Sequence, residues 1–567
     1  GFCPVNPAAL DSYMDNLARY IRATGIDGIM IDETCFHGLE FCGCAACRKA
    51  FKADTDWELP ANELSKDLNN KESALWRTWL AWRQKKVGDF WYEVKKRASA
   101  INPEFVVMGY TTHYGMTSTY GSLNQGNALE QLARTWDFIG TEIMSRNIYA
   151  SYRSVQAFRK AKNQYRNSAG IPVFGLVYSS GYDWNVLYFG WALNNMNGQT
   201  TWEMTGIQCP EGQSNYRRFN REKGNMNLLK AEPQADIALV FSNASRDWPR
   251  MAAYPPDVFG TSQLLSARHI QHEFLNESGL RSDALKKFKV LFLNNAMALD
   301  DVAWNGVKQF VKDGGTLYLS GRTGMADEAG TLREHFLPAD FFPGLSLGDR
   351  PVKCREFVGK DGKTIKIATP AYGAEFLWQD GKPQGEVLMT AVVSPKVSVP
   401  ALLRIAYGKG QVYLTPFLFG NPAQALEVTS TKPMSFDPQP DAEALYYAVM
   451  ETAGIIPNVW NPVRVPEAVL TSVYRDGKDT MIHFLNATGS KFKKGEIVPS
   501  ILKGNPYPAP TEDIVFEVPG KFTEIYAVSP DFEGQKPLTG KYENGVTQVT
   551  LPKELLKVYT IVHLIAE

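Results

Sequence analysis

Two adjacent carboxylates near the start of the chain, Asp32 and Glu33, are the residues whose type and position most directly suggest chemistry. They follow a short apolar run, residues 28–31, that is typical of a buried β-strand. In (β/α) barrels, catalytic carboxylates lie at the carboxyl ends of the strands, where the active site forms. Paired carboxylates in that position are typical of enzymes that cleave glycosidic bonds. Because neighbouring strand residues point to opposite faces, we expect the two acids to differ in role.

A cysteine cluster follows these acids. Cys42, Cys44 and Cys47 have the spacing C-x-C-x2-C, and further cysteines lie nearby at Cys3 and Cys35. Thiolates at this spacing are typical of a tetrahedral zinc site, which takes four protein ligands when the metal is structural. The sequence therefore predicts a structural zinc that is held by the cluster and completed by one of the two other cysteines. An odd total of seven cysteines also favours a thiolate site over a disulfide framework.

Other polar and aromatic residues stand at the ends of later predicted strands. Glu142 ends the run 137–142 and is a candidate catalytic partner for the first acids. Each carboxylate can also serve as a helix cap or an ion-pair partner, and most aromatic residues are core. The side chains predicted to contact a sugar substrate are His113, Tyr178, Asp183, Trp184, Trp202 and Glu203.

Composition limits the classes of partner. Lys+Arg and Asp+Glu both number 60, so the formal net charge is zero, and the electrostatic basis for binding nucleic acid or anionic membranes is missing. We also find no apolar run long enough to span a bilayer. The 567 residues predict about three or four domains, at the prior of one per ~150 residues.

The order of predicted elements divides the chain into three parts. Residues 1–232 alternate helices with five short strands and indicate strands four to eight of a (β/α)8 barrel. We therefore expect the intact protein to carry a further N-terminal segment that supplies strands one to three. Residues 233–460 indicate a separate α/β domain, with buried strands at 236–241, 289–293 and 316–320 and a helix at 301–312. Residues 461–567, with hairpin signals at Asp476-Gly477 and Asn544-Gly545, indicate a β-sandwich.

The segment Cys3-Pro4-Val5-Asn6-Pro7, and the acid-terminated strand followed by the cysteine cluster, resemble glycoside hydrolase family 42, the β-galactosidases. This resemblance implies that Glu33 is the general acid/base. It also implies that the zinc ligands are Cys3, Cys42, Cys44 and Cys47. The middle part resembles the family's glutamine-amidotransferase-like trimerisation domain at residues 289–293, 314–316 and 407–410. A homo-oligomer, by analogy a trimer, is therefore expected.

Two departures from the family leave the catalytic roles open. Asp32 stands where the family has Asn, and the strand 172–178 ends without the Glu that serves as its nucleophile. In one assignment Asp32 is the nucleophile and Glu142 the acid/base, an arrangement similar to that of α-galactosidases. In the other, Glu33 keeps the family role and Glu142 replaces the missing nucleophile.

The sequence thus predicts a glycoside hydrolase, retaining and exo-acting, that removes a terminal sugar from an oligosaccharide. The alternative is a non-catalytic carbohydrate-binding protein on a degenerate barrel. A metal-dependent hydrolase is disfavoured because no His/Asp ligand set flanks an open coordination position.

Overall fold

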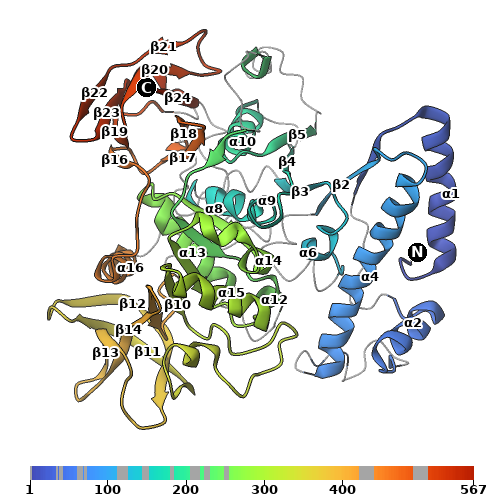
Figure 1. The fold of residues 1–567 in the computed structure, drawn as a ribbon, viewed down its shortest axis with the longest axis horizontal. Helices are drawn as coiled ribbons and strands as arrows, with labels where there is room; N and C mark the ends of the chain where they lie inside the picture. The colour runs from blue at the N-terminus through green and yellow to red at the C-terminus, as the bar shows by residue number, and fades with distance from the viewer. Residues whose placement is uncertain are drawn as a thin grey trace.

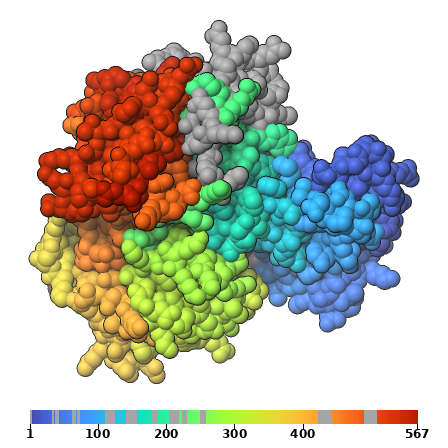
Figure 2. Space-filling model, turned by 45° about the horizontal axis from the view of Figure 1, so that its top comes forward, coloured from blue at the N-terminus to red at the C-terminus, as the bar shows by residue number. Residues whose placement is uncertain are grey.

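The protein is a multi-domain α/β structure with a β-rich C-terminal part (Figure 1). The N-terminal helices lie at one side of the molecule and the C-terminal strands at the opposite side (Figures 1 and 2). Every helix of the described chain is too short or too polar to cross a membrane. The computed structural model describes residues 3–32, 36, 42–60, 68, 70, 73–111, 125–143, 152–178, 184–204, 218–221, 230–247, 254–420, 440–488 and 508–567.

A five-stranded sheet in the order β1-β2-β3-β4-β5 forms the first part, and every neighbouring pair is parallel. Its strands are β1 (Gly28–Ile31), β2 (Val106–Thr111), β3 (Phe138–Ile143), β4 (Val173–Tyr178) and β5 (Thr200–Met204). The five strands agree with those predicted from the apolar runs. The accompanying helices are α1 (Pro7–Thr24), α2 (Ala45–Thr55), α4 (Ala74–Ser99), α6 (Leu129–Leu132), α8 (Tyr152–Lys162), α9 (Gln164–Ala169) and α10 (Trp184–Met196).

Helix α1 has clear start and stop signals. The side chain of Asn6 accepts a hydrogen bond from the Ala8 N–H, and Pro7 occupies the first turn, where its missing N–H costs nothing. Gly25 ends the helix with a φ of +66°, a left-handed conformation that glycine adopts without steric penalty. The Asn-Pro pair of the family-like segment therefore has a local structural role.

A nine-stranded mixed sheet forms the middle part. Five strands are parallel in the order β8-β7-β9-β10-β15, and four antiparallel strands, in the order β14-β13-β11-β12, extend the sheet from β15. The sequence pattern predicted the strands at 236–241, 289–293 and 316–320 and the helix 301–312, but neither β8 nor the antiparallel extension. The elements are β7 (Ile237–Val240), α12 (Asn243–Asp247), α13 (Tyr254–Ala267), β8 (His272–Leu275), α14 (Glu277–Leu280), η3 (Asp283–Lys287), β9 (Val290–Asn294), α15 (Asp301–Lys312), β10 (Thr316–Ser320), η4 (Leu337–Asp340), β11 (Leu345–Gly359), β12 (Thr364–Trp378), β13 (Glu386–Ser394), β14 (Val397–Tyr407), β15 (Gly410–Thr415) and α16 (Pro440–Ala453).

Two antiparallel sheets around a shared apolar core form the C-terminal part. Asn544 and Gly545 both have positive φ values, +50° and +86°, as the predicted hairpin turn requires. One sheet contains β16 (Asn461–Arg464), β19 (Ile514–Pro519), β23 (Val546–Leu551) and β22 (Gly540–Glu543). The other contains β21 (Lys536–Pro537), β20 (Phe522–Val528), β24 (Tyr559–Ala566), β18 (Asp479–Asn486), β17 (Val469–Asp476) and β6 (Glu232–Pro233), and η8 (Lys553–Leu555) precedes β24.

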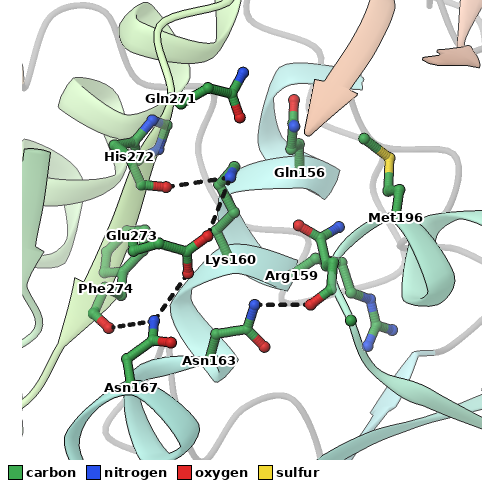
Figure 3. Close-up of polar contacts among 12 residues, drawn as sticks. Gln156, Arg159, Lys160, Asn163, Asn167, Met196, Gln271, His272, Glu273 and Phe274 are labelled. Atoms are coloured by element: carbon green, nitrogen blue, oxygen red, sulfur yellow. Dashed lines mark hydrogen bonds and ion pairs between the residues drawn. The ribbon is translucent and has the colours of Figure 1, made fainter. Parts of the chain in front are cut away.

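A buried polar network joins the first part to the middle part, where α8 and α9 pack against β8 (Figure 3). Lys160 Nζ donates to the His272 carbonyl at 3.1 Å and lies 3.7 Å from Glu273 Oε1. The Asn167 amide donates to Glu273 Oε2 at 2.8 Å and to the Phe274 carbonyl at 3.0 Å. One apolar core continues through both parts, so these contacts fix how the two sheets lie relative to each other.

Candidate functional site

The four cysteines predicted to bind metal come together from two segments of the chain. Cys3 lies in a turn before α1, where its carbonyl accepts a hydrogen bond from the Asn6 N–H at 3.1 Å. Cys42 and Cys44 precede α2, whose N-cap is Cys44, and Cys47 is buried in the first turn of that helix. The spacing C-x-C-x2-C thus places three thiols around one helix N-terminus, whose partial positive charge favours thiolates.

The geometry of the cluster fits a tetrahedral ion. All four Sγ atoms lie within 4.8 Å of one another, and Cys3 Sγ lies 3.7 Å from Cys44 Sγ and 3.5 Å from Cys47 Sγ. A tetrahedral zinc with Zn–S bonds of about 2.3 Å requires neighbouring sulfurs about 3.8 Å apart. The sulfurs are too far apart for disulfides, which need about 2.05 Å, so the thiols are free to act as ligands.

The thiols perturb one another. Cys47 acts as a hydrogen-bond partner of the Cys3 sulfur, and this contact lowers the pKa of Cys3 to about 5. The same contact and burial raise the pKa of Cys47, and burial raises that of Cys42. One thiolate is therefore stabilised by protonated neighbours, and a divalent cation would replace those protons as the partner of the sulfurs.

Aromatic packing anchors the cluster to α4. The Phe51 ring lies 5.5 Å from Trp79 and 5.3 Å from Trp82, measured between ring centroids, and the two indoles stack on each other. Trp82 Nε1 donates to Asp54 Oδ2 at 2.8 Å, which ties α4 to α2. These tryptophans form the core beside buried Cys47. The cysteine cluster therefore braces α1, α2 and α4 near the start of the first sheet.

The predicted catalytic acids belong to the carboxyl edge of that sheet. Asp32 follows the last residue of β1 and is exposed. Glu142 occupies the last but one position of β3, in register with Leu176 of β4. Because the strands are parallel, these positions share one edge of the sheet. Glu33 lies outside the described residues, as do the predicted sugar contacts His113 and Asp183.

The two faces of the sheet differ in environment. On one face Gly175 lies against the side chains of Arg159 and Asn194, on α8 and α10, so helices cover it. On the other face Met30, Val106 and Phe138 keep exposed fractions of 39, 40 and 38%. By the alternation of strand residues, position 142 belongs to this second face.

Strand register separates the remaining candidates between the faces. Leu176 pairs with Trp202, and Val177 pairs with Glu203. Trp202 is half-buried and packs against Phe174 with ring centroids 6.3 Å apart. Position 142 shares the row of Leu176 and Trp202, whereas position 203 lies in the row of buried Val177 on the helix-covered face. The backbone thus puts positions 142 and 202 on the same face of the sheet, two strands apart, and position 203 on the opposite face.

Two further predicted sugar contacts are described only by their backbone positions. Tyr178 is the last residue of β4, in register with Met204, and Trp184 is the first residue of α10. Both positions therefore lie at the carboxyl end of β4 or directly after the loop that follows it.

Comparisons with known proteins relate this arrangement to solved structures. No protein-family model and no curated protein matches the sequence. Among solved structures, an α-L-fucosidase isoenzyme 2 from Paenibacillus thiaminolyticus superposes with a TM-score of 0.68 at 16% identity, covering 100% of this chain and 81% of that one. A cold-adapted β-galactosidase from Rahnella sp. R3 has a TM-score of 0.67 at 13% identity, with 99% and 82% covered. A catalytic mutant of Gan42B, a GH42 β-galactosidase from G. stearothermophilus, has a TM-score of 0.65 at 12% identity, with 99% and 82% covered.

This is a family 42-like glycoside hydrolase fold. The family 42-like fold agrees with the prediction made from the cysteine segment and the acid-terminated strand. At 12–16% identity the likeness concerns the fold. The chemistry of this chain has to be argued from its own residues.

Proposed function

We propose that the protein is a retaining, exo-acting glycoside hydrolase that removes a terminal sugar from an oligosaccharide. The observation that carries the proposal is the shared edge of the parallel sheet, where Asp32 follows β1 and Glu142 stands near the end of β3. Retaining cleavage needs two carboxyl groups about 5–5.5 Å apart, one as nucleophile and one as acid/base. Trp202, in the same row as position 142, supplies an apolar surface against which a sugar ring can pack.

The chemistry follows in two steps. One carboxylate attacks the anomeric carbon while the acid donates its proton to the leaving oxygen, which gives a glycosyl-enzyme ester. The acid, now a carboxylate, then removes a proton from water as the water displaces the ester. Either Asp32 attacks and Glu142 is the acid/base, or Glu142 attacks and Glu33 is the acid/base. Both assignments need a carboxylate after β1 and one on β3.

Hydrolysis of α- and β-linked nitrophenyl glycosides by the wild type, Asp32→Asn, Glu33→Gln and Glu142→Gln tests this proposal. Nitrophenolate leaves without protonation, so loss of the acid slows the first step less than loss of the nucleophile does. Asp27→Asn, an exposed acid at the opposite end of β1, is the matched control. If Asp32→Asn or Glu142→Gln abolishes turnover and Asp27→Asn does not, the proposal is supported. Turnover that survives all three site variants refutes it.

One observation favours a second candidate function, a non-catalytic carbohydrate-binding protein. Strand β4, Val173–Tyr178, carries no carboxylate, although the resemblance predicts a nucleophile at its end. A binding protein would give no turnover on any glycoside of the panel but would retain oligosaccharide binding that depends on Trp202.

We also propose that Cys3, Cys42, Cys44 and Cys47 hold a structural zinc. Four suitably spaced thiols in a core that joins α1, α2 and α4 support this role. With four protein ligands no coordination position remains for water or substrate, so the metal would brace the loop after β1 and take no part in hydrolysis.

A homo-oligomer, by analogy a trimer, is the proposed assembly. Apolar side chains stay exposed on the antiparallel extension of the middle sheet, and such patches often mark contacts between subunits. They are Tyr372, Leu377, Val393 and Val397. Light scattering coupled to size exclusion tests the assembly, and Leu377→Asp should shift it toward the monomer. A monomeric wild type contradicts the proposal.

A further inference from the structure

A cleft of about 930 Å³ lies between the helices of the first part and the middle part, apart from the carboxyl edge of β1–β5. Residues of α4, α6 and α9 line one wall. Residues of α12, α14 and the segment 298–300 form the other. Its volume lies in the range of about 300–1,000 Å³ that is typical of small-molecule sites.

The cleft opens where the topology of the middle sheet favours a ligand. In the order β8-β7-β9-β10-β15, the chain passes from β7 to β8 on one side and then to β9 on the other. The loops after two strands that diverge in this way leave a crevice at the carboxyl edge of a parallel sheet, and ligands of doubly wound folds bind there. The loops after β7, β8 and β9 all line the cleft, through Asn243, Glu277 and Ala298.

Buried polar groups lie in the walls, and Arg246 contacts two of them from behind the lining. The Arg246 guanidinium, fully buried, lies 3.1 Å from Glu130 Oε1 and 2.9 Å from Asp247 Oδ1. Glu277 accepts hydrogen bonds from the Ala244 N–H at 3.2 Å and from the Asn243 amide at 3.3 Å. Two carboxyl groups, those of Glu130 and Asp247, therefore contact the guanidinium, and Asn243 links a third, that of Glu277, to it. Loss of hydration raises the pKa of Glu130 to about 6 and also raises that of Glu277.

Two polar atoms of the walls have no hydrogen-bond partner among the described residues. They are the hydroxyl of Tyr165, a residue only 1% exposed, and Glu130 Oε2. Both residues line the cleft. A buried polar atom without a partner is costly, so these two atoms point to a ligand that supplies the missing hydrogen bonds.

The charges of the walls disfavour an anionic ligand. Among the described residues that line the cleft, carboxyl groups outnumber cations: the acids are Asp54, Glu130, Asp247, Glu277, Asp300 and Glu328, and the cations are Arg77, Lys85, Lys86 and Arg281. Several cations at the rim already have acidic partners, in the pairs Lys85–Asp89, Lys86–Asp54 and Arg281–Asp300. The ligand should instead carry several groups that donate to carboxylates and can also accept from a phenol. Hydroxyl groups do both.

We propose that this cleft binds a small neutral polyol of the sugar class, one to two rings in size. The Glu130 carboxylate accepts from one ligand hydroxyl, and the Tyr165 phenol exchanges a hydrogen bond with another. The inference goes beyond the proposed hydrolase function, because it needs none of the residues of the catalytic edge.

Calorimetric titration with D-glucose, D-galactose, L-fucose, D-xylose and lactose tests the proposal on the full chain. The variants are Tyr165→Phe, Glu130→Gln and, as a matched control, Tyr20→Phe on exposed α1. Because the Tyr165 hydroxyl has no described partner to lose, Tyr165→Phe should fold normally, so it decides the question even if Glu130→Gln is unstable. A Glu142→Gln variant separates this cleft from the catalytic edge.

At least one of the five sugars should bind the wild type and Glu142→Gln with equal affinity. Tyr165→Phe should weaken that binding about five- to tenfold, the effect of one lost hydrogen bond, and Tyr20→Phe should leave it unchanged. The proposal is overturned if none of the five sugars binds. It is also overturned if binding is lost in Glu142→Gln or unaffected by Tyr165→Phe. Hydrolysis of nitrophenyl glycosides is read separately, so failure of one proposal leaves the other standing.

Discussion

Removing the charge of Glu273 is expected to destabilise the contact between α8 and β8. The side chains of Lys160 and Glu273 are only 4% and 6% exposed, so water cannot replace a lost partner. Glu273→Gln preserves the shape of the side chain, and its amide oxygen can still accept from Asn167. Among the described residues, the Lys160 ammonium then keeps the His272 carbonyl as its acceptor and faces a neutral amide in place of the carboxylate. A buried cation without its counter-ion costs roughly 3–5 kcal/mol.

The partner substitution is expected to cost less. In Lys160→Met, Glu273 keeps the hydrogen bond from Asn167 and the guanidinium of Arg166 at 3.9 Å, so we expect a loss of about 1–3 kcal/mol. Burial already lowers the pKa of Lys160. In Glu273→Gln the lysine can therefore release its proton and become neutral, which would keep the cost of that variant near 3 kcal/mol, the lower end of the range of roughly 3–5 kcal/mol. The double variant should be less destabilised than the sum of the two single variants, with a coupling of ~0.5–3 kcal/mol.

Differential scanning calorimetry at pH 7 measures this cycle. A loss of 3–5 kcal/mol should lower the melting temperature of the unit that contains both sheets by roughly 6–20 °C. The exposed pair Lys287–Glu232, 3.0 Å apart, is the matched control and should change stability by only ~0–1 kcal/mol when broken. Single variants that melt like this control, or whose effects add in the double variant, would contradict a stabilising ion pair between Lys160 and Glu273.

Three further predictions concern the metal, the histidines and the tryptophans. Purified protein should contain one zinc per chain by elemental analysis, and Cys44→Ser should lose it. Cys354→Ser, which changes a buried thiol outside the cluster, should retain the zinc. Equal zinc content in the two variants contradicts the site. Trp202→Ala should lower kcat/KM with little change in melting temperature. Trp79→Ala, in the core, should instead lower the free energy of unfolding by about 3–5 kcal/mol. The reverse pattern contradicts the placement of the site. Stability should be constant above about pH 6.5 and fall as the pH drops toward 4, because unfolding frees buried histidines to take up protons, each adding a slope of up to about 1.4 kcal/mol per pH unit. Burial lowers the pKa of His269 and His563 to about 4 and the pKa of His272 and His483 to about 3. A flat stability profile from pH 7 to 4.5 would contradict the neutrality of these four side chains.

Local sequence signals accounted for much of the fold. The apolar run 28–31 is β1, the predicted helix 301–312 is α15 with its stated limits, and Asn544-Gly545 is the tight turn between β22 and β23. Each of these depends on interactions within a few residues, such as a cap, a turn conformation or alternating burial. The cysteine spacing likewise indicated a cluster, because three of its four members belong to one short segment.

The antiparallel extension and the interdomain cleft could not be predicted in this way. Strands β11–β14 are long and partly exposed, so their burial pattern is irregular. The walls of the cleft contain Glu130, Tyr165 and Glu277, which belong to the helices α6, α9 and α14 and are far apart in the sequence. No spacing in the sequence connects residues that only the packing of α9 against β8 and α14 brings together.

Trapping of the covalent intermediate tests whether hydrolysis passes through a glycosyl ester on Asp32 or Glu142. An activated 2-deoxy-2-fluoro glycoside of the sugar that gives turnover should accumulate as an ester on the nucleophile of a retaining enzyme, and peptide mass mapping then locates the labelled residue. We expect one label per chain, on Asp32 or Glu142, and no label in the variant that lacks that carboxylate. A label on another residue, or turnover by the wild type without any trapped ester, would contradict it.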